Sequence, residues 1–189
     1  DADASIREQL TMLQDLQIAK TIRPLQRPDD TRRAAVGPLS LAGVFKPEAD
    51  VVVYEGRCED LLASMPDGCV QLVLTSPPYN LGKAYERRTD MDTYVREQST
   101  VIEEAVRVLA DNGSLCWQVG NHVDTGEIFP LDVVLYPVFK SLGMRLRNRI
   151  VWNFEHGLHA TKRLSGRQET ILWFTKTDDY YFDVDPIRV

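Results

Sequence analysis

The sequence predicts an α/β protein built on a mostly parallel, doubly wound sheet, and two observations support this prediction. First, beyond residue 50, short apolar runs of strand length alternate with longer segments whose apolar residues recur at helical spacing. Second, clusters of Pro, Gly, Asn and Asp fall between these segments, where turns are expected. Such alternation is typical of sheets whose parallel strands are connected by helices. A chain of 189 residues is long enough to bury one hydrophobic core.

The first fifty residues predict a helix and a linker, which we assign to a separate region, residues 1–50. Apolar residues at helical spacing predict a helix over Ser5–Lys20; they are Ile6, Leu10, Leu13, Leu16 and Ile18. Prolines at positions 24, 28 and 38 then break the pattern. The apolar stripe has two interpretations: it docks on the sheet domain, or it pairs with a second subunit in a homodimer.

The main domain is predicted over residues 51–189, and its most informative part comes early. A short helix near residue 60 leads through the turn Met65-Pro66-Asp67-Gly68 into an apolar run, Val70–Leu74. This run predicts a buried parallel strand. The hexapeptide Thr75-Ser76-Pro77-Pro78-Tyr79-Asn80 follows it directly. Because ligands of open α/β sheets bind at the carboxyl ends of strands, these six residues are the candidate site.

The remaining elements alternate in type along the chain. We predict a helix over Asp92–Leu109, a break at Asp111-Asn112-Gly113, a strand over Ser114–Asn121, a helix over Leu131–Ser141 capped by Gly143, and strands over Arg149–Phe154 and Glu169–Lys176.

The hexapeptide and its surroundings resemble the amino-methylating DNA methyltransferases, which carry an [Asp/Asn/Ser]-Pro-Pro-[Tyr/Phe] motif after a strand. The resemblance extends from about Val51 to Val189 and covers the catalytic half of that family. It implies a Rossmann-like, doubly wound methyltransferase sheet, incomplete in this chain. It also implies transfer of a methyl group from S-adenosylmethionine to an exocyclic base amine. Ser76 favours N4 of cytosine over N6 of adenine, because the family's adenine enzymes more often carry Asp or Asn there.

The chemistry explains why these residue types are needed. An exocyclic amine is a poor nucleophile because its lone pair is delocalised into the ring. We expect Ser76 Oγ and the Pro77 carbonyl to accept hydrogen bonds from its two N–H groups. The Pro77-Pro78 pair holds that carbonyl rigidly, since proline fixes φ. Tyr79 is expected to stack on a base flipped out of the duplex. The predicted catalytic residues are therefore Ser76, Pro77, Pro78 and Tyr79.

The sequence contains only part of the site that the family uses to bind S-adenosylmethionine, the methyl donor. We assign S-adenosylmethionine contacts to Gly56, Asp60, Thr75 and Asn80. Arg57 stands where the family commonly has Asp after the glycine, and Glu59 or Asp60 would have to replace it. The family's main donor loop is Phe-x-Gly-x-Gly, yet the 11 glycines form no Gly-x-Gly. In one circularly permuted order of the family that loop comes late, so we expect this sequence to be part of a longer enzyme.

Basic residues concentrate in one segment although the net charge is −6. Between Arg145 and Arg167 there are six basic residues and one acid. Double-stranded DNA is bound largely through its phosphates, so this segment predicts a DNA contact. The predicted DNA-binding residues are Lys83, Arg87, Arg88, His156, Lys162, Arg163 and Arg167. The alternative is a solvated charged surface. His156 and His159 have no evident third ligand, so no metal is predicted.

The composition predicts a cytoplasmic protein, and the resemblance implies a prokaryotic or phage source. No apolar run has the length of a membrane span, and no signal-peptide pattern is present at the start. The resemblance implies a restriction-modification system with a cognate endonuclease as partner. Two alternatives remain open: a methyltransferase of the same fold that acts on RNA or another amine, and a catalytically silent subunit that binds nucleic acid or a partner.

Overall fold

The computed structural model describes residues 40–84, 86–155 and 160–188, so the helix predicted over Ser5–Lys20 and the predicted DNA contact His156 lie outside the described residues. The chain divides into two compact units. The larger unit is Leu39–Phe182 and carries every element discussed below except one. The described part of the smaller unit contains the short 3-10 helix η1 (Asp185–Ile187).

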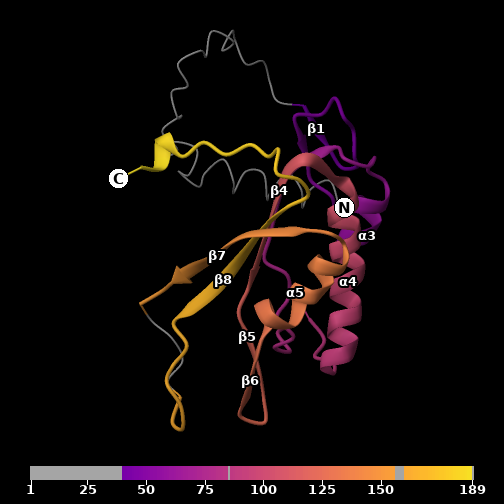
Figure 1. Cartoon of the computed structure of the whole chain (residues 1–189). Helices are drawn as coiled ribbons and strands as arrows, with labels where there is room; N and C mark the ends of the chain where they lie inside the picture. Colours follow the sequence, from indigo (N-terminus) through magenta and orange to yellow (C-terminus); the bar gives the residue numbers. More distant parts are fainter. Residues whose placement is uncertain (1–39, 85, 156–159, 189) are drawn as a thin grey trace. The chain divides into compact units, whose positions relative to one another are not determined.

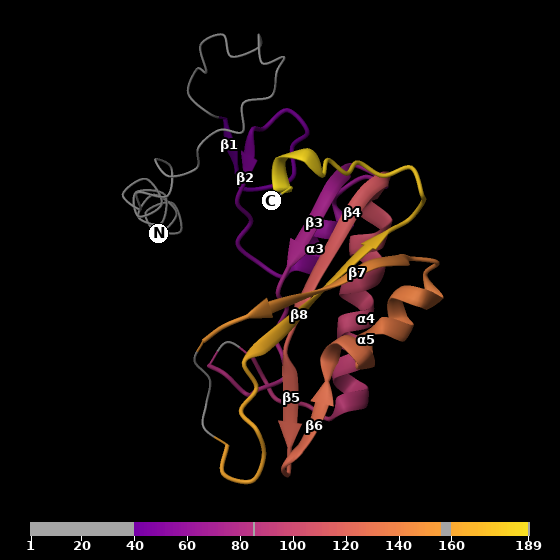
Figure 2. The same ribbon diagram turned by 60° about the vertical axis from the view of Figure 1, so that its left-hand side comes forward.

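A four-stranded sheet forms the centre of the larger unit (Figure 1). Its strand order is β3-β4-β8-β7, and Figure 2 labels all four strands. Its strands are β3 (Val70–Thr75), β4 (Leu109–Val119), β8 (Gln168–Thr175) and β7 (Arg145–Asn153). β3 pairs in parallel with β4, and β8 pairs antiparallel with both β4 and β7. Three strands therefore point the same way, which confirms the Rossmann-like α/β prediction. The antiparallel β8 between β4 and β7 was not predicted.

The core lies between this sheet and two helices, α4 (Met91–Val108) and α5 (Leu131–Ser141), which contact each other (Figure 2). Ile102 and Ala105 of α4 and Phe139 of α5 are buried in one cluster with the buried residues of β4 and β8. The short helix α3 (Cys58–Ala63) packs beside α4. No helix within the described ranges is long and apolar enough to cross a membrane.

The start of β4 differs from its prediction. The strand begins at Leu109, and the predicted break Asp111-Asn112-Gly113 lies inside it. The register with β3 jumps from Val70 opposite Leu109 to Leu72 opposite Ser114, so these residues form a bulge rather than a loop. A Cβ on Gly113 would lie 2.9 Å from the Gln71 carbonyl oxygen, so the bulge requires glycine at this point.

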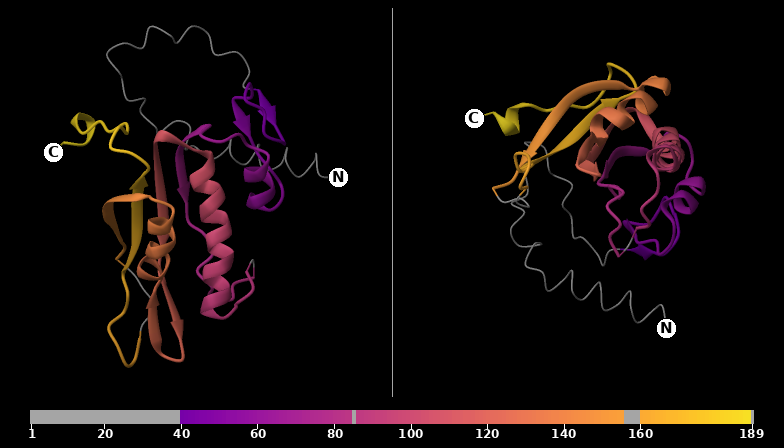
Figure 3. Two further views of the ribbon diagram at one scale, coloured as in Figure 1. Left: turned by 45° about the vertical axis from the view of Figure 1, so that its right-hand side comes forward. Right: turned by 90° about the horizontal axis from the view of Figure 1, so that it is seen from below.

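Two small strand pairs complete the larger unit. β5 (Asn121–Asp124) and β6 (Glu127–Pro130) form an antiparallel hairpin that continues beyond the carboxyl end of β4 (Figure 3). Thr125 and Gly126 have positive φ in its two-residue turn, as tight hairpins require. This hairpin was not predicted. β1 (Leu41–Ala42) and β2 (Val51–Val52) pair in parallel before α3.

Candidate active site at the carboxyl end of the sheet

Four segments that are distant in sequence meet at one edge of the sheet. Ser76 follows the end of β3, Gly120 follows β4, and Phe154 follows β7. Because β8 runs the other way, its beginning lies at the same edge, with Thr170 opposite Val119. The sheet topology thus brings the predicted motif next to residues that lie up to 90 positions away along the chain.

A cavity of about 600 Å³ opens where these segments meet, and we call it the Tyr79 cavity. Its walls combine apolar side chains with a few polar groups: Tyr79, Leu81, Gly120, Asn121, Val123, Ile128, Phe154, Arg163, Leu164, Gly166, Gln168 and Glu169. A concave, largely apolar site with a few convergent polar groups is typical of small-ligand and cofactor pockets.

Tyr79 is the centre of a hydrogen-bond chain along one side of this cavity. Its hydroxyl lies 2.9 Å from Ser76 Oγ and donates to Glu169 Oε2 over 3.0 Å. Gln118 Nε2 donates to the same carboxylate oxygen over 2.7 Å. Burial and the neighbouring negative charge of Glu169 raise the pKa of Tyr79 to about 12. Tyr79 therefore keeps its proton at neutral pH and donates a hydrogen bond to Glu169.

The Tyr79 ring also packs closely against Gly120. A Cβ at position 120 would lie 3.1 Å from Tyr79 Cε2 and 3.2 Å from Cδ2. A side chain at position 120 would require the ring to shift by a few tenths of an ångström, so glycine permits the observed ring position. The ring is held from the hydroxyl end and from its edge.

Helix α4 fixes the backbone of the proline pair. The Tyr94 hydroxyl donates to the Pro78 carbonyl oxygen over 3.0 Å. Tyr94 is 3% exposed, and burial raises the pKa of its hydroxyl, which stays a donor. The Pro77 carbonyl accepts no hydrogen bond from the described residues and remains free to bind a ligand.

The loop after the motif is held by Asn80, which is 2% exposed and has a φ of 59°. Its side chain donates to the Thr89 carbonyl and accepts from the Thr89 N–H, each over 2.8 Å. The Glu86 carboxylate accepts from the backbone N–H groups of Asn80 and Leu81, again over 2.8 Å. Asn80 tolerates positive φ better than most residues, which explains its position at this bend.

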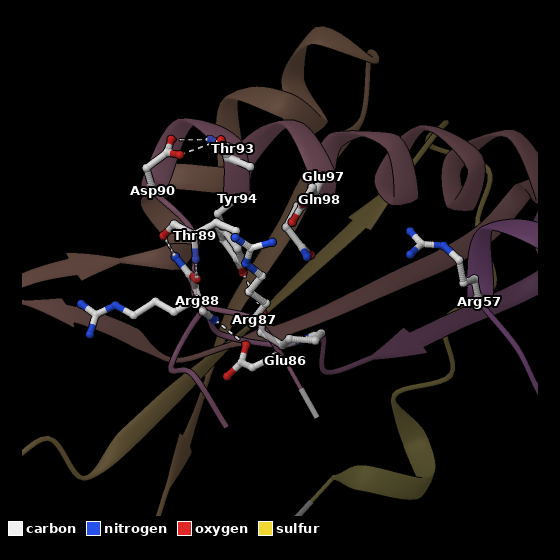
Figure 4. Close-up of a pocket in the computed structure, with 12 residues that line it drawn as sticks. Arg57, Glu86, Arg87, Arg88, Thr89, Asp90, Thr93, Tyr94, Glu97 and Gln98 are labelled. Carbon is white, nitrogen blue, oxygen red and sulfur yellow. Dashed lines mark hydrogen bonds between the residues drawn. The ribbon is translucent and has the colours of Figure 1, made fainter. Parts of the chain in front are cut away.

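A second cavity of about 620 Å³ is lined by Pro78 and Asn80, and we call it the Tyr94 cavity (Figure 4). Charged and polar residues dominate its walls: Arg57, Pro78, Asn80, Glu86, Arg87, Arg88, Thr89, Asp90, Thr93, Tyr94, Glu97 and Gln98. Gln98 is 8% exposed, and its side-chain oxygen has no hydrogen-bond partner among the described residues. A buried acceptor without a partner costs free energy unless a ligand or water satisfies it.

The predicted site residues are distributed over both cavities. Of the four contiguous catalytic candidates, Tyr79 lines the Tyr79 cavity and Pro78 lines the Tyr94 cavity, whereas Ser76 and Pro77 are not among the lining residues of either. Of the predicted donor contacts, Asn80 lines the Tyr94 cavity, Gly56 precedes its lining residue Arg57, and Thr75 ends β3. Asp60 is exposed on α3 and lines neither cavity.

The predicted DNA contacts lie around the same edge. Arg163 lines the Tyr79 cavity, whereas Arg87 and Arg88 line the Tyr94 cavity. Arg88 forms an ion pair of 2.6 Å with Asp124 in the β5-β6 hairpin. The other described candidates are exposed on loops: Lys83, Lys162 and Arg167.

Sequence reasoning missed four residues that build this site: Gly120, Phe154, Tyr94 and Glu169. Glu169 alone carried a signal, because it is an acid just before the apolar run Ile171–Phe174 of β8. The other three occupy ordinary positions at the ends of elements. Their roles depend on contacts between segments that the sequence does not place together.

Comparison with known proteins identifies the family. Residues 70–189 match the sequence model of the N6 and N4 DNA methylases. The chain is 51% identical to the type II methyltransferase M.BglII of Bacillus subtilis, over 72% of this chain and 38% of the relative. It is 32% identical to M.ScaI of Streptomyces caespitosus, over 84% of this chain and 52% of the relative.

Solved structures agree with the fold. The PvuII DNA methyltransferase (cytosine-N4-specific) aligns with a TM-score of 0.62 at 23% identity, over 71% of this chain and 52% of that chain. A proposed DNA modification methylase from Thermus thermophilus, solved with S-adenosyl-L-methionine, aligns with a TM-score of 0.56 at 28% identity, over 69% and 55% of the two chains. The chain spans about half the length of these proteins or less. It belongs to the DNA methylase family of N6 and N4 amino-methyltransferases.

Proposed function

We propose that the protein carrying this chain is a type II DNA methyltransferase that methylates N4 of cytosine in double-stranded DNA after flipping the base. One observation carries the proposal: the Ser76-Pro77-Pro78-Tyr79 motif follows the carboxyl end of β3, and its Tyr79 lines one cavity while its Pro78 lines another. The names of the relatives support the reaction class, since M.BglII and M.ScaI are type II methyltransferases. A cognate restriction endonuclease is the partner that this class implies.

The Tyr79 cavity is the proposed base site. Its volume of about 600 Å³ exceeds what a single base requires, and its apolar walls suit an unstacked ring. Stacking on Tyr79 would contribute about 1–3 kcal/mol, which offsets much of the few kcal/mol needed to extrude a base. Ser76 Oγ and the free Pro77 carbonyl then accept the two amine N–H groups. These hydrogen bonds localise the lone pair on the nitrogen.

The Tyr94 cavity is the proposed donor site, and its residues fit the donor's chemistry. S-adenosylmethionine carries a carboxylate, an ammonium group and an adenine. Arg57 and Arg87 provide cations for the carboxylate, Glu97 provides an anion, and the orphan oxygen of Gln98 provides an acceptor. When bound, the donor supplies a methyl group whose bond to sulfur breaks as the amine nitrogen binds the carbon, and the nitrogen releases one proton to water.

Ser76 supports cytosine as the target base. The adenine enzymes of the family more often carry Asp or Asn at this position, which presents a carboxylate or amide oxygen instead of a hydroxyl.

Analysis of modified nucleosides tests the proposal most directly. The full-length protein that contains this sequence would be incubated with double-stranded DNA and labelled S-adenosylmethionine, and the digested DNA analysed by mass spectrometry. We expect N4-methylcytosine, with Tyr79→Ala as the control that loses it. Detection of N6-methyladenine instead would mean that adenine, not cytosine, is the target base. Methylation of RNA but not of DNA would mean that RNA is the substrate. If the protein neither methylated a nucleic acid nor bound S-adenosylmethionine, it would be a catalytically silent subunit.

Reversing the charges of Arg163 and Arg167 is expected to weaken DNA binding and reduce its salt dependence. Both lie in the loop that borders the Tyr79 cavity, where DNA phosphates would pass. Each lost phosphate contact lowers the slope of log K against log salt by about 1, so the double variant should lose about 2. Titrations of DNA at several salt concentrations measure this slope.

The matched control is Lys46→Glu, an exposed residue between β1 and β2, which should keep the wild-type slope. A wild-type slope in the Arg163→Glu, Arg167→Glu variant would assign both residues to a solvated surface instead.

A further inference from the structure

Glu169 lies on β8, 90 residues after Tyr79 in the sequence, and contacts the predicted catalytic motif through Tyr79. Its Oε2 atom accepts hydrogen bonds from the Tyr79 hydroxyl and from Gln118 Nε2, over 3.0 Å and 2.7 Å. Gln118 lies on the neighbouring strand β4, so two strands hold this oxygen in place. The family motif does not explain why an acid should stand here.

The direction of each hydrogen bond in the chain follows from the groups available. An ionised carboxylate has no proton and only accepts, so Tyr79 must donate to Glu169. The Tyr79 oxygen is then left with lone pairs towards Ser76, 2.9 Å away, and the Ser76 hydroxyl must donate to it. Once its one proton is used in this way, Ser76 Oγ presents only lone pairs in its other directions.

This arrangement matters because the proposed substrate is an amine. An amine N–H requires an acceptor, and a serine hydroxyl free to rotate would also offer its proton to the amine lone pair. Such a hydrogen bond would engage the lone pair of the amine nitrogen, which must attack the methyl group. A fixed proton direction removes this competing arrangement, at no cost in reorganisation during the reaction.

We propose that Glu169 is a positioning residue for methyl transfer, which acts through Tyr79 to make Ser76 Oγ an acceptor for the target amine. The inference rests on the proposed function and assigns a role within the same site. It also gives Tyr79 a second task besides stacking, because its hydroxyl transmits the orientation from Glu169 to Ser76.

The test is Glu169→Gln in the full-length protein, with steady-state methylation of DNA as the assay. The amide has the same shape as the carboxylate and can donate a hydrogen bond to Tyr79. The direction of the hydrogen bonds from Ser76 through Tyr79 to residue 169 is then no longer fixed. We expect kcat to fall about 10- to 100-fold, as for the loss of a hydrogen bond to a charged group. The KM for DNA, the binding of DNA and the melting temperature should stay at wild-type values. Glu103→Gln, on the exposed side of α4, is the matched control and should keep the wild-type kcat.

A double-mutant cycle with Tyr79→Phe separates the proposed role from the alternatives. Tyr79→Phe keeps the ring and removes the hydroxyl, so adding Glu169→Gln should cause no further loss of kcat. If Glu169→Gln lowered kcat equally in the wild-type and Tyr79→Phe proteins, Glu169 would contact the base directly, and the proposal would be overturned. A wild-type kcat in Glu169→Gln, or a loss confined to KM or to the melting temperature, would also overturn it. A wild-type protein that methylates no base would instead reject the proposed function, on which the inference rests.

Discussion

Replacement of Tyr79 by alanine is expected to lower kcat for DNA methylation by about 10- to 100-fold or more, because the ring contributes about 1–3 kcal/mol of stacking to a flipped base. The same change removes the hydroxyl that lies 2.9 Å from Ser76 Oγ. Tyr79 is only half-buried and follows the sheet rather than forming its core, so folding and donor binding should change little. Steady-state kinetics, with calorimetric binding of S-adenosylmethionine, would measure both effects.

Tyr79→Phe is the control that divides these contributions. It keeps the stacking ring against Gly120 and loses only the hydroxyl, so its kcat should lie between those of the wild type and Tyr79→Ala. A Tyr79→Ala protein with wild-type kcat would remove Tyr79 from the base site, and would leave the Tyr79 cavity without its proposed ligand.

Replacement of Phe139 by alanine is expected to lower the free energy of unfolding by about 3–5 kcal/mol, the usual cost of truncating a buried aromatic residue. Phe139 is fully buried on α5, with its ring centroid 4.4 Å from that of Phe174 on β8 and 5.6 Å from that of Trp117 on β4. It therefore joins the helix to the two strands that carry Gln118 and Glu169. Urea unfolding followed by circular dichroism gives the difference directly.

Val133→Ala, on the same helix, is the matched control. Val133 is 60% exposed, so its truncation should change the free energy of unfolding by about 0.5 kcal/mol or less. Similar losses in the two variants would show that the packing of α5 on the sheet does not depend on Phe139.

Much of the local structure could be predicted from the sequence, because it depends on residues close together in the chain. The motif strand was expected over Val70–Leu74 and is observed as Val70–Thr75, parallel to β4 as predicted. Its predicted burial is wrong: β3 is the outer strand of the described sheet, and Leu72 and Leu74 are 56% and 68% exposed. The helix expected over Leu131–Ser141 has those bounds, and Gly143 follows it with a φ of 77°. The Ser76–Asn80 segment was placed correctly at a strand's carboxyl end, because an apolar run followed by two prolines specifies that junction locally.

The errors share one physical origin, which is pairing between distant segments. Asp111-Asn112-Gly113 has the composition of a turn, yet pairing with β3 draws it into a bulged strand. The strand that begins near Glu169 was predicted, but not its antiparallel insertion between β4 and β7. The order of strands in a sheet depends on packing between side chains of neighbouring strands, so it cannot be read from any single segment.

The sequence by itself determined the α/β class and the position of the Ser76–Tyr79 motif after a strand, because periodicity and turn chemistry depend on consecutive residues. The motif's resemblance to the amino-methyltransferases indicated the family. Only the tertiary structure decided which residues surround that motif. The reversal of β8 places Glu169 against Tyr79, the end of β4 places Gly120 beside the same ring, and α4 brings Tyr94 to the Pro78 carbonyl. These contacts arise from burying a shared core, whose free energy is gained only when the distant segments come together.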